Sequence, residues 1–193
     1  MHPLAGPRTA VIGQRVYFVA MNLSEHHYQV RVVWTGNRGA GTSSYRSYTR
    51  DHEVASAGVP IIPGSADPTF HGNPERWNPE QLLLAALSQC HMLSYLHMAV
   101  KNGIVVTAYE DAAEGTMRLN ADGSGEFTGV ILKPRVTITD STVKHTAQSI
   151  HTDAAAACFI GRSVNFPVLH EPVVMVGGTA NPVTELSRQK TTA

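Results

Sequence analysis

The sequence has little charge and very little cysteine. Charged residues make up 16% of the 193 positions, against about 25% in a typical soluble domain. The 15 basic residues are balanced by 15 acidic ones, and Lys and Arg form no run. Because nucleic acids and anionic membranes recruit basic surfaces, neither is expected as a main partner. Two cysteines in a chain of this length are no disulfide framework, so both thiols are expected to be reduced at rest.

The sequence also lacks a long uninterrupted apolar run. The N-terminal stretch 10–21 is broken by Gly13, Gln14 and Arg15, so it does not have the apolar centre of a secretory signal. The most apolar stretch, 82–100, contains Ser, Gln and His side chains and is too polar for a lipid-spanning helix. We therefore expect a soluble, cytoplasmic protein.

What is present suits a single α+β domain. The length and the 42% hydrophobic content are those of one domain with a sizeable core. We expect an N-terminal extension over residues 1–25, the folded domain over 26–181 and a polar tail over 182–193.

The folded region begins with a predicted hairpin. Residues 28–34 alternate and are rich in β-branched side chains, which favours a strand, and residues 35–41 have the composition of a turn. A second strand is predicted over 42–55. A loop rich in Gly and Pro follows over 56–77, and loops of this length are often functional.

A long central helix is predicted next. Asn78 can cap it, Pro79 suits its first position, and Glu80 suits the positive end of the helix dipole. The helix should run to about Lys101 and stop at Gly103. Because apolar residues occur on all its sides, we expect it to be buried, with a sheet on one side and a partner subunit on the other.

The second half of the chain is predicted to hold a strand pair, a helix and a last strand. The strands cover 105–119 and 125–140, with a turn between them at 122–123. A helical stripe from Val143 through Ala154 reaches Cys158, and 171–176 reads as the last strand. This order has no βαβ alternation.

The two thiols are the main candidates for chemistry. Cys90 lies in the middle of the central helix and Cys158 near the end of the second helix. Either could be only a small buried apolar residue. Zinc binding is not favoured, because His97 and His151 are each two helical turns, ~10 Å, from the nearer cysteine. No phosphate-binding glycine loop and no serine elbow is present, so the residues alone predict a domain with one or two thiols of interest.

Three segments resemble one known family. Residues 78–91 read Asn-Pro-Glu-Gln-Leu and continue through small and apolar residues to Cys90, with Glu80 ten residues before it. Residues 151–158 end in Cys158, and residues 34–42 form a W-x-G…R-G-x-G-T pattern. In this order they resemble the OsmC/Ohr family of thiol-dependent hydroperoxide reductases, over about 28–176. The resemblance implies antiparallel sheets around a long buried central helix, in an intertwined homodimer.

The resemblance also implies a mechanism without a bound cofactor. Cys90 would be the peroxidatic thiol that reduces an organic hydroperoxide and becomes a sulfenic acid. Cys158 would condense with it to a disulfide, which an external dithiol, of lipoyl type in part of the family, would reduce. The family places an Arg against the thiolate, held by the Glu, here Glu80. The pattern points to Arg38, with Arg50 second and Arg46 also physically possible.

Helix geometry indicates how such a site could be assembled. Glu80 and Cys90 on one straight helix are ~15 Å apart along its axis. Either a long Arg spans part of this gap, or Glu80 is supplied by a second subunit, and we expect a homodimer with composite sites. An apolar pocket is expected near the thiols; its candidate residues are Leu83, Leu87, Met92, Leu93 and Phe159.

Two points stay open at this stage. Phe159 stands where the family often has Pro, so the resolving role of Cys158 and the substrate preference do not carry over directly. The same fold could instead serve a protein without catalysis, which binds a small apolar ligand or senses redox state through its thiols.

Overall fold

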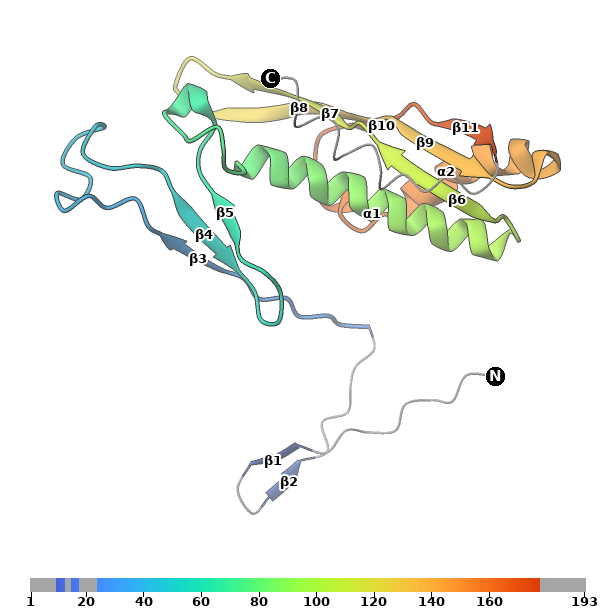
Figure 1. Cartoon of the computed structure of the whole chain (residues 1–193), viewed down its shortest axis with the longest axis horizontal. Helices are drawn as coiled ribbons and strands as arrows, with labels where there is room; N and C mark the ends of the chain where they lie inside the picture. The colour runs from blue at the N-terminus through green and yellow to red at the C-terminus, as the bar shows by residue number, and fades with distance from the viewer. Residues whose placement is uncertain (1–9, 13–14, 18–23, 178–193) are drawn as a thin grey trace.

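The computed structural model describes residues 10–12, 15–17 and 24–177. The expected tail at 182–193, and most of the expected extension at 1–25, lie outside these ranges. Within the extension, β1 (Ala10–Ile12) and β2 (Arg15–Tyr17) form an antiparallel pair. Figure 1 shows the order of the remaining elements along the chain.

The central helix is confirmed. Helix α1 spans Pro79–Lys101. The backbone N–H of Gln81 donates to Asn78 Oδ1 at 2.7 Å, and that of Asn78 donates to Gln81 Oε1 at 3.2 Å, so the two residues form a complete capping box. Gly103 follows the helix with φ of 66°, a left-handed conformation that glycine adopts without strain.

Two three-stranded sheets lie beside α1 (Figure 1). The two predicted long strands are each divided in two, by 112–113 and by Lys133, because the chain crosses there from one sheet to the other. One sheet has the order β11-β9-β6, and the other has the order β10-β8-β7. The strands are β6 (Val106–Asp111), β7 (Glu114–Leu119), β8 (Gly125–Leu132), β9 (Pro134–Ile138), β10 (Val168–His170) and β11 (Val173–Val176).

The α+β class is confirmed, but the strand directions are mixed. β6 pairs antiparallel with β9, and β7 pairs antiparallel with β8, as expected. β10 runs parallel to β8 and β11 parallel to β9. The expected antiparallel sheets are therefore antiparallel only in part, and β9, α2 and β11 form one βαβ crossover, although the chain has no repeated βαβ alternation.

Helix α2 (Lys144–Ala157) follows the predicted stripe. A short 3-10 turn, Ser141–Val143, precedes it and is capped by the side chain of Asp140. Cys158 is the first residue after α2, and a second 3-10 turn, Gly161–Ser163, comes next. The core lies where α1 and α2 meet the β11-β9-β6 sheet. Its fully buried members are Tyr95, Ala99, Ile104, Val136, Ile138, Ala147, Ile150, Ala154 and Val174.

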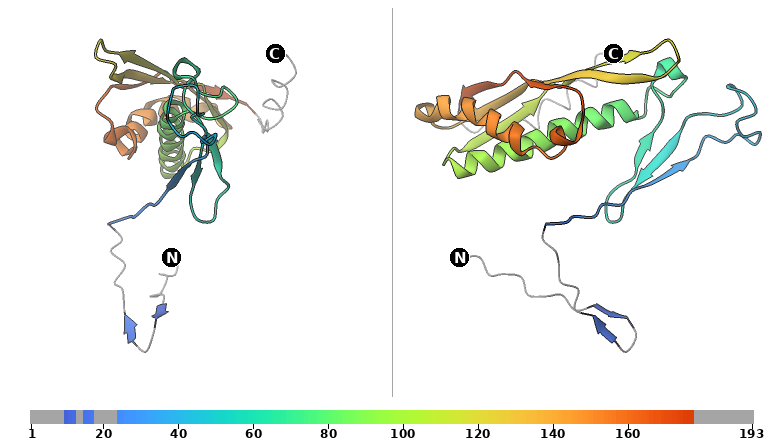
Figure 2. Two further views of the ribbon diagram at one scale, coloured as in Figure 1. Left: turned by 90° about the vertical axis from the view of Figure 1, so that its left-hand side faces the viewer. Right: turned by 180° about the vertical axis from the view of Figure 1, so that it is seen from behind.

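A separate antiparallel sheet extends away from this body beyond the first turn of α1 (Figures 1 and 2). It consists of β3 (Arg31–Trp34), β4 (His52–Ala55) and β5 (Ile62–Gly64). The predicted second strand over 42–55 is only its last four residues, and 35–51 form a long loop. A 3-10 turn, Pro68–Phe70, lies between β5 and α1.

Helix α1 is buried on one face only. Leu87, His91, Tyr95 and Ala99 face the core, whereas Leu93 and Val100 on the opposite side are 60% and 78% exposed. The prediction of burial all round therefore does not hold within one chain. By length and composition α1 could cross a membrane. Its inner stripe, however, packs into the core, and that stripe contains the polar side chain of His91.

Candidate functional site

The structure brings the two cysteines together. Cys90 lies midway along α1, and Cys158 lies at the C-terminal end of α2, which packs against α1. Both are free thiols, and Cys90 lies near enough to Cys158 to raise the pKa of the Cys158 thiol. Cys158 is buried and Cys90 is half-buried. Two thiols from different elements thus lie close together, with the more accessible one on the central helix.

Burial makes Cys158 a poor acid. Burial, then the neighbouring Cys90, raises the pKa of the Cys158 thiol to about 11, although the backbone N–H of Gly161 donates to its Sγ at 3.3 Å and works in the opposite direction. Phe159, which replaces the Pro common in the family, is 80% exposed. The turn after α2 forms without Pro, because the N–H of Arg162 donates to the Cys158 carbonyl at 3.0 Å.

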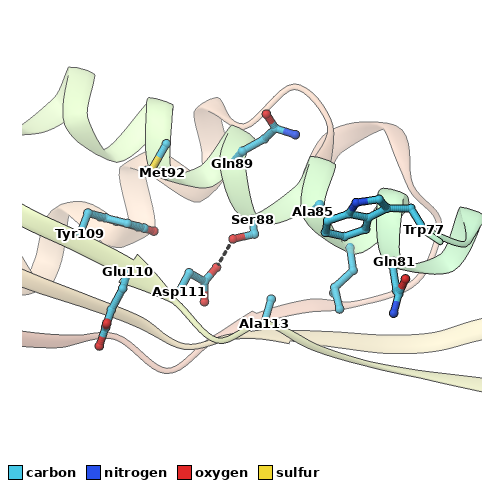
Figure 3. A pocket seen from close by; sticks show the side chains of 11 residues that line it. Trp77, Gln81, Ala85, Ser88, Gln89, Met92, Tyr109, Glu110, Asp111 and Ala113 are labelled. Atoms are coloured by element: carbon cyan, nitrogen blue, oxygen red, sulfur yellow. Dashed lines mark hydrogen bonds between the residues drawn. The ribbon is translucent and has the colours of Figure 1, made fainter. Parts of the chain in front are cut away.

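A cavity of about 410 Å³ lies between α1 and the end of β6 with its link to β7 (Figure 3). Met92 and Tyr109 stand at one end, and Trp77 and Gln81 stand at the other. Ser88 crosses the gap and donates to Asp111 Oδ2 at 2.6 Å. The lining is mainly apolar with a few fixed polar groups, which is the composition of a pocket for a small, largely apolar molecule.

A second cavity, of about 160 Å³, contains the Cys158 side of the thiol pair. Its residues are Leu87, Leu132, Ala155, Cys158, Gly161, Arg162, Val168 and His170. Cys158 and His170 therefore line one cavity, between the C-terminal end of α2 and β10.

Three histidines that the sequence analysis treated as scattered form one group next to this cavity. His91 Nε2 lies 3.1 Å from His151 Nδ1, and the His91 and His170 ring centroids are 4.3 Å apart. Tyr95 stacks on His151 at 4.1 Å. His91 and His151 are buried, and burial lowers the pKa of His91 to about 3 and of His151 to about 4.

The buried stripe of α1 could have revealed this group. Leu87, His91, Tyr95 and Ala99 recur every four residues, so His91 belongs to the same face as the core residues before and after it. On α2, His151 likewise sits between the buried residues Ile150 and Ala154. Among the described residues, no set of three or more His, Cys, Asp or Glu side chains is arranged to hold a metal ion.

Among the residues that the structure describes, Glu80 forms no ion pair with an arginine. One carboxylate oxygen, Oε2, is buried and has no hydrogen-bond partner among residues 24–177. A buried carboxylate oxygen without a partner is costly. Its position at the start of α1 is confirmed, and its predicted ion pair is not formed by the single chain.

The three candidate arginines lie together on the loop between β3 and β4. Arg38, Arg46 and Arg50 line a cavity of about 670 Å³ with Tyr45, Tyr48, Thr49 and His71, and neither cysteine is among its lining residues. The loop therefore gathers the predicted cations without bringing them to the thiol of the same chain.

Within the described residues, the loop holds the Arg50 guanidinium in place but gives the Arg38 side chain no partner. Arg50 donates to the carbonyls of Tyr45 and Tyr48 at 2.9 and 3.2 Å, and its guanidinium lies 4.4 Å from the Tyr48 ring centroid. In the part of the chain that the structure describes, Arg38 has no hydrogen-bond or ion-pair partner.

Hydrogen bonds explain the sequence pattern around Arg38. Asn37 Oδ1 accepts from the backbone N–H groups of Gly39 and Gly41 at 2.9 and 3.1 Å, and both glycines have positive φ. Gly36 is required for another reason, since a β-carbon there would collide with the carbonyl of Thr49. The pattern thus builds a turn that presents Arg38 at the surface.

The predicted apolar pocket is only partly formed. Met92 lines the cavity of about 410 Å³, and Leu87 lines the cavity of about 160 Å³. Leu83 packs in the second core cluster, with Leu87, Val130 and Leu132. Leu93 and Phe159 are exposed in the single chain.

Comparison with known proteins places the fold. Residues 72–171 match the family described as OsmC-like protein. The uncharacterized protein YmaD of Bacillus subtilis is 22% identical over 161 residues, which cover 81% of this chain and 99% of that protein.

Solved structures give the same result. An OsmC-like protein of unknown function from Vibrio cholerae, VCA0330, is 29% identical, with a TM-score of 0.70 over 77% of this chain and all of that one. An organic hydroperoxide resistance protein from Elizabethkingia anophelis is 17% identical, with a TM-score of 0.57 over 79% of this chain and 99% of that one. At that identity it shows the fold alone.

Proposed function

The chain belongs to the OsmC-like protein family, and on that premise we propose that it is a cysteine peroxidase that reduces organic hydroperoxides to alcohols. The observation that carries the proposal is the proximity of the two free thiols, one half-buried on the central helix and one buried at the end of α2. A solved protein of the same fold is named an organic hydroperoxide resistance protein, which supports the substrate class.

The proposed reaction has three balanced steps. The Cys90 thiolate attacks the distal oxygen of ROOH, the O–O bond breaks, and ROH leaves with one proton as Cys90 becomes a sulfenic acid. The Cys158 sulfur then attacks the Cys90 sulfur, and the hydroxyl group leaves as water when the disulfide forms. An external dithiol of the lipoyl type reduces this disulfide by exchange and is itself oxidised to a cyclic disulfide.

Cys90 needs a cation to be a thiolate near neutral pH, because an ordinary cysteine titrates at about 8.5. We assign this role to Arg38 rather than Arg50. Arg38 is unpaired in the described chain, whereas Arg50 is already held by two backbone carbonyls and the Tyr48 ring. Glu80 would orient Arg38, since its buried Oε2 still requires a donor.

The site is proposed to be completed in a homodimer. Apolar side chains are exposed on the free face of α1, at Leu93 and Val100, and along β3, at Val32 and Trp34. A partner that covers these side chains could also bring an Arg38 to Glu80 and Cys90. The reduced resting thiols that this cycle needs are those of a cytoplasmic protein.

Turnover of cumene hydroperoxide with dihydrolipoamide tests this function. The wild-type protein should consume peroxide catalytically, and mass spectrometry of the oxidised form should identify a Cys90–Cys158 disulfide. Cys158→Ser should consume about one equivalent of peroxide per chain and then stop, because its sulfenic acid has no resolving thiol. Exposed His145→Gln should behave as wild type. Failure of the wild type to turn over any alkyl hydroperoxide would contradict the proposal.

The cavity of about 410 Å³ favours one alternative, a binding protein for a small apolar ligand. A Cys90→Ser, Cys158→Ser double variant separates the two functions, since it cannot react with peroxide but keeps the cavity. Thermal stabilisation of this variant by an apolar ligand, together with a wild type inactive toward peroxides, would favour binding as the function.

A further inference from the structure

The histidine group at the thiols has no role in the chemistry described so far. It joins three elements, because His91 is on α1, His151 on α2 and His170 at the end of β10. The ring of His170 lies against that of His91, which is hydrogen-bonded to His151. His91 and His151 are buried and His170 is half-buried, and holding three titratable rings away from water is costly unless they serve the site next to them.

His170 is the member of the group that lines a cavity together with the proposed resolving cysteine. His170 and Cys158 line the same cavity of about 160 Å³, whose walls include Leu87, Leu132 and Val168. Arg162 also lines it, but a guanidinium has no free lone pair to accept a proton. Of the side chains that line this cavity, only His170 can take up the proton of the Cys158 thiol near neutral pH.

The surroundings keep His170 neutral and therefore able to act as a base. Burial lowers its pKa from the ordinary value of 6.5, and Asp111 on β6 works in the opposite direction. His91 and His151 are neutral for the same reason of burial, and Tyr109 on β6 stays protonated because burial raises its pKa. A neutral imidazole has one nitrogen free to accept a proton.

We propose that His170 is the general base of disulfide formation, taking the thiol proton of Cys158 as its sulfur attacks the sulfenic acid of Cys90. The inference rests on the proposed peroxidase function. The S–S bond forms, the S–O bond breaks, and the bonding pair leaves with the hydroxyl group. The imidazolium returns the proton to that group, which departs as water, so His170 ends neutral and no further oxidant is required. His91 acts as a positioning residue, because its ring packs against His170.

Such a base has a large effect because Cys158 ionises so poorly. A thiol with a pKa of about 11 is a thiolate in only about 1 of 10⁴ molecules at pH 7. A positioned base avoids this prior ionisation and typically contributes 10²–10⁴-fold. The resolving step, rather than the attack on peroxide, is therefore where the histidine group should act.

A rapid-quench experiment separates the two steps. Reduced protein is mixed with one equivalent of cumene hydroperoxide, and mass spectrometry follows the dimedone-trapped sulfenic acid and the disulfide. In His170→Gln, peroxide consumption should match the wild type, disulfide formation should slow about 100-fold, and sulfenic acid should accumulate. Imidazole in the buffer should restore part of the rate, and exposed His145→Gln should change neither step.

The pH profile gives a second readout that does not depend on folding of the variant. With His170 as base, the wild-type rate of disulfide formation should be flat between about pH 7 and 9, because neutral imidazole and protonated thiol are then the main forms. Without a base it should rise about tenfold per pH unit, as expected for His170→Gln. A wild-type rate that rises in this way, or a variant as fast as wild type, would refute the role of His170 and leave the peroxidase intact. A wild-type Cys90 that does not react with peroxide would refute both.

Discussion

Peroxide turnover by Cys90→Ser and by Arg38→Ala, each as a pure protein, should be at least about 100-fold lower than that of the wild type. When equal amounts of the two variant chains are refolded together, the mixture should regain about a quarter of wild-type activity. The first variant lacks the thiol proposed to attack the peroxide. The second leaves Cys90 without the cation that we assign to stabilise its thiolate.

The recovery follows from a site shared between chains. In a mixed dimer, Cys90 of the Arg38→Ala chain meets Arg38 of the Cys90→Ser chain, which makes one complete site of two. Half of the dimers are mixed at random association, so about a quarter of all sites are complete. The structure favours this arrangement because Arg38 and Cys90 line no common cavity in one chain, and buried Glu80 Oε2 has no donor among the residues described there.

A matched mixture provides the control. Cys90→Ser mixed with Cys158→Ser should regain nothing, because the two thiols that lie close together come from the same chain and each site then lacks one of them. Turnover with dihydrolipoamide, at fixed total protein, measures both mixtures. No recovery in the Arg38→Ala mixture would place Arg38 and Cys90 of one chain in the same site.

The elements specified by local chemistry were predictable from the sequence. Helix α1 begins and ends where Asn78 and Gly103 indicate, because a capping box and a left-handed glycine are short-range signals. The stripe of α2, and with it the position of Cys158, follows from helical periodicity in the same way.

Strand pairing and loop structure that depend on contacts between distant segments were not predictable from the sequence. The parallel pairing of β11 with β9 joins segments on either side of α2, and no local feature selects the partner or direction of a strand. The loop over 35–51 has the composition of a strand in its second half. It is held instead by side chains bonded to the backbone, such as Trp34 Nε1, which donates to the Thr49 carbonyl at 2.8 Å.

The residues of the candidate site were likewise predictable only in part. Cys90, Cys158 and Glu80 were located through sequence patterns, and the proximity of the thiols follows from the packing of α1 on α2. His170 could not be found this way, because it comes to line a cavity with Cys158 only through the parallel pairing of β10 with β8. Nothing in residues 168–170 alone indicates that neighbour.

Mild acid should destabilise the fold by about 3 kcal/mol between pH 7.5 and 5.5. His91 and His151 have pKa values of about 3 and about 4 in the folded state, lowered mainly by burial, against about 6.5 when unfolded. Below about pH 6.5 the unfolded chain therefore binds more protons than the folded one, and the free energy of unfolding falls as pH falls. Stability is complete above the unfolded pKa and declines down to the folded values. Burial lowers the pKa of His170 as well, which adds in the same direction.

Urea unfolding at a fixed protein concentration, at several pH values from about 5.5 to 7.5, measures this slope, because carboxyl groups of the unfolded chain titrate mostly below that range. A His91→Gln, His151→Gln double variant should be less stable at pH 7.5 yet lose much less on acidification, since Gln cannot be protonated. The exposed His145→Gln should keep the wild-type slope. A wild type equally stable at both ends of the range would mean that the buried rings are already protonated, or can relax into water, in the folded state. A protonated His170 could not accept the Cys158 proton, so the stability slope and the rate of disulfide formation report on the charge of the same group of side chains.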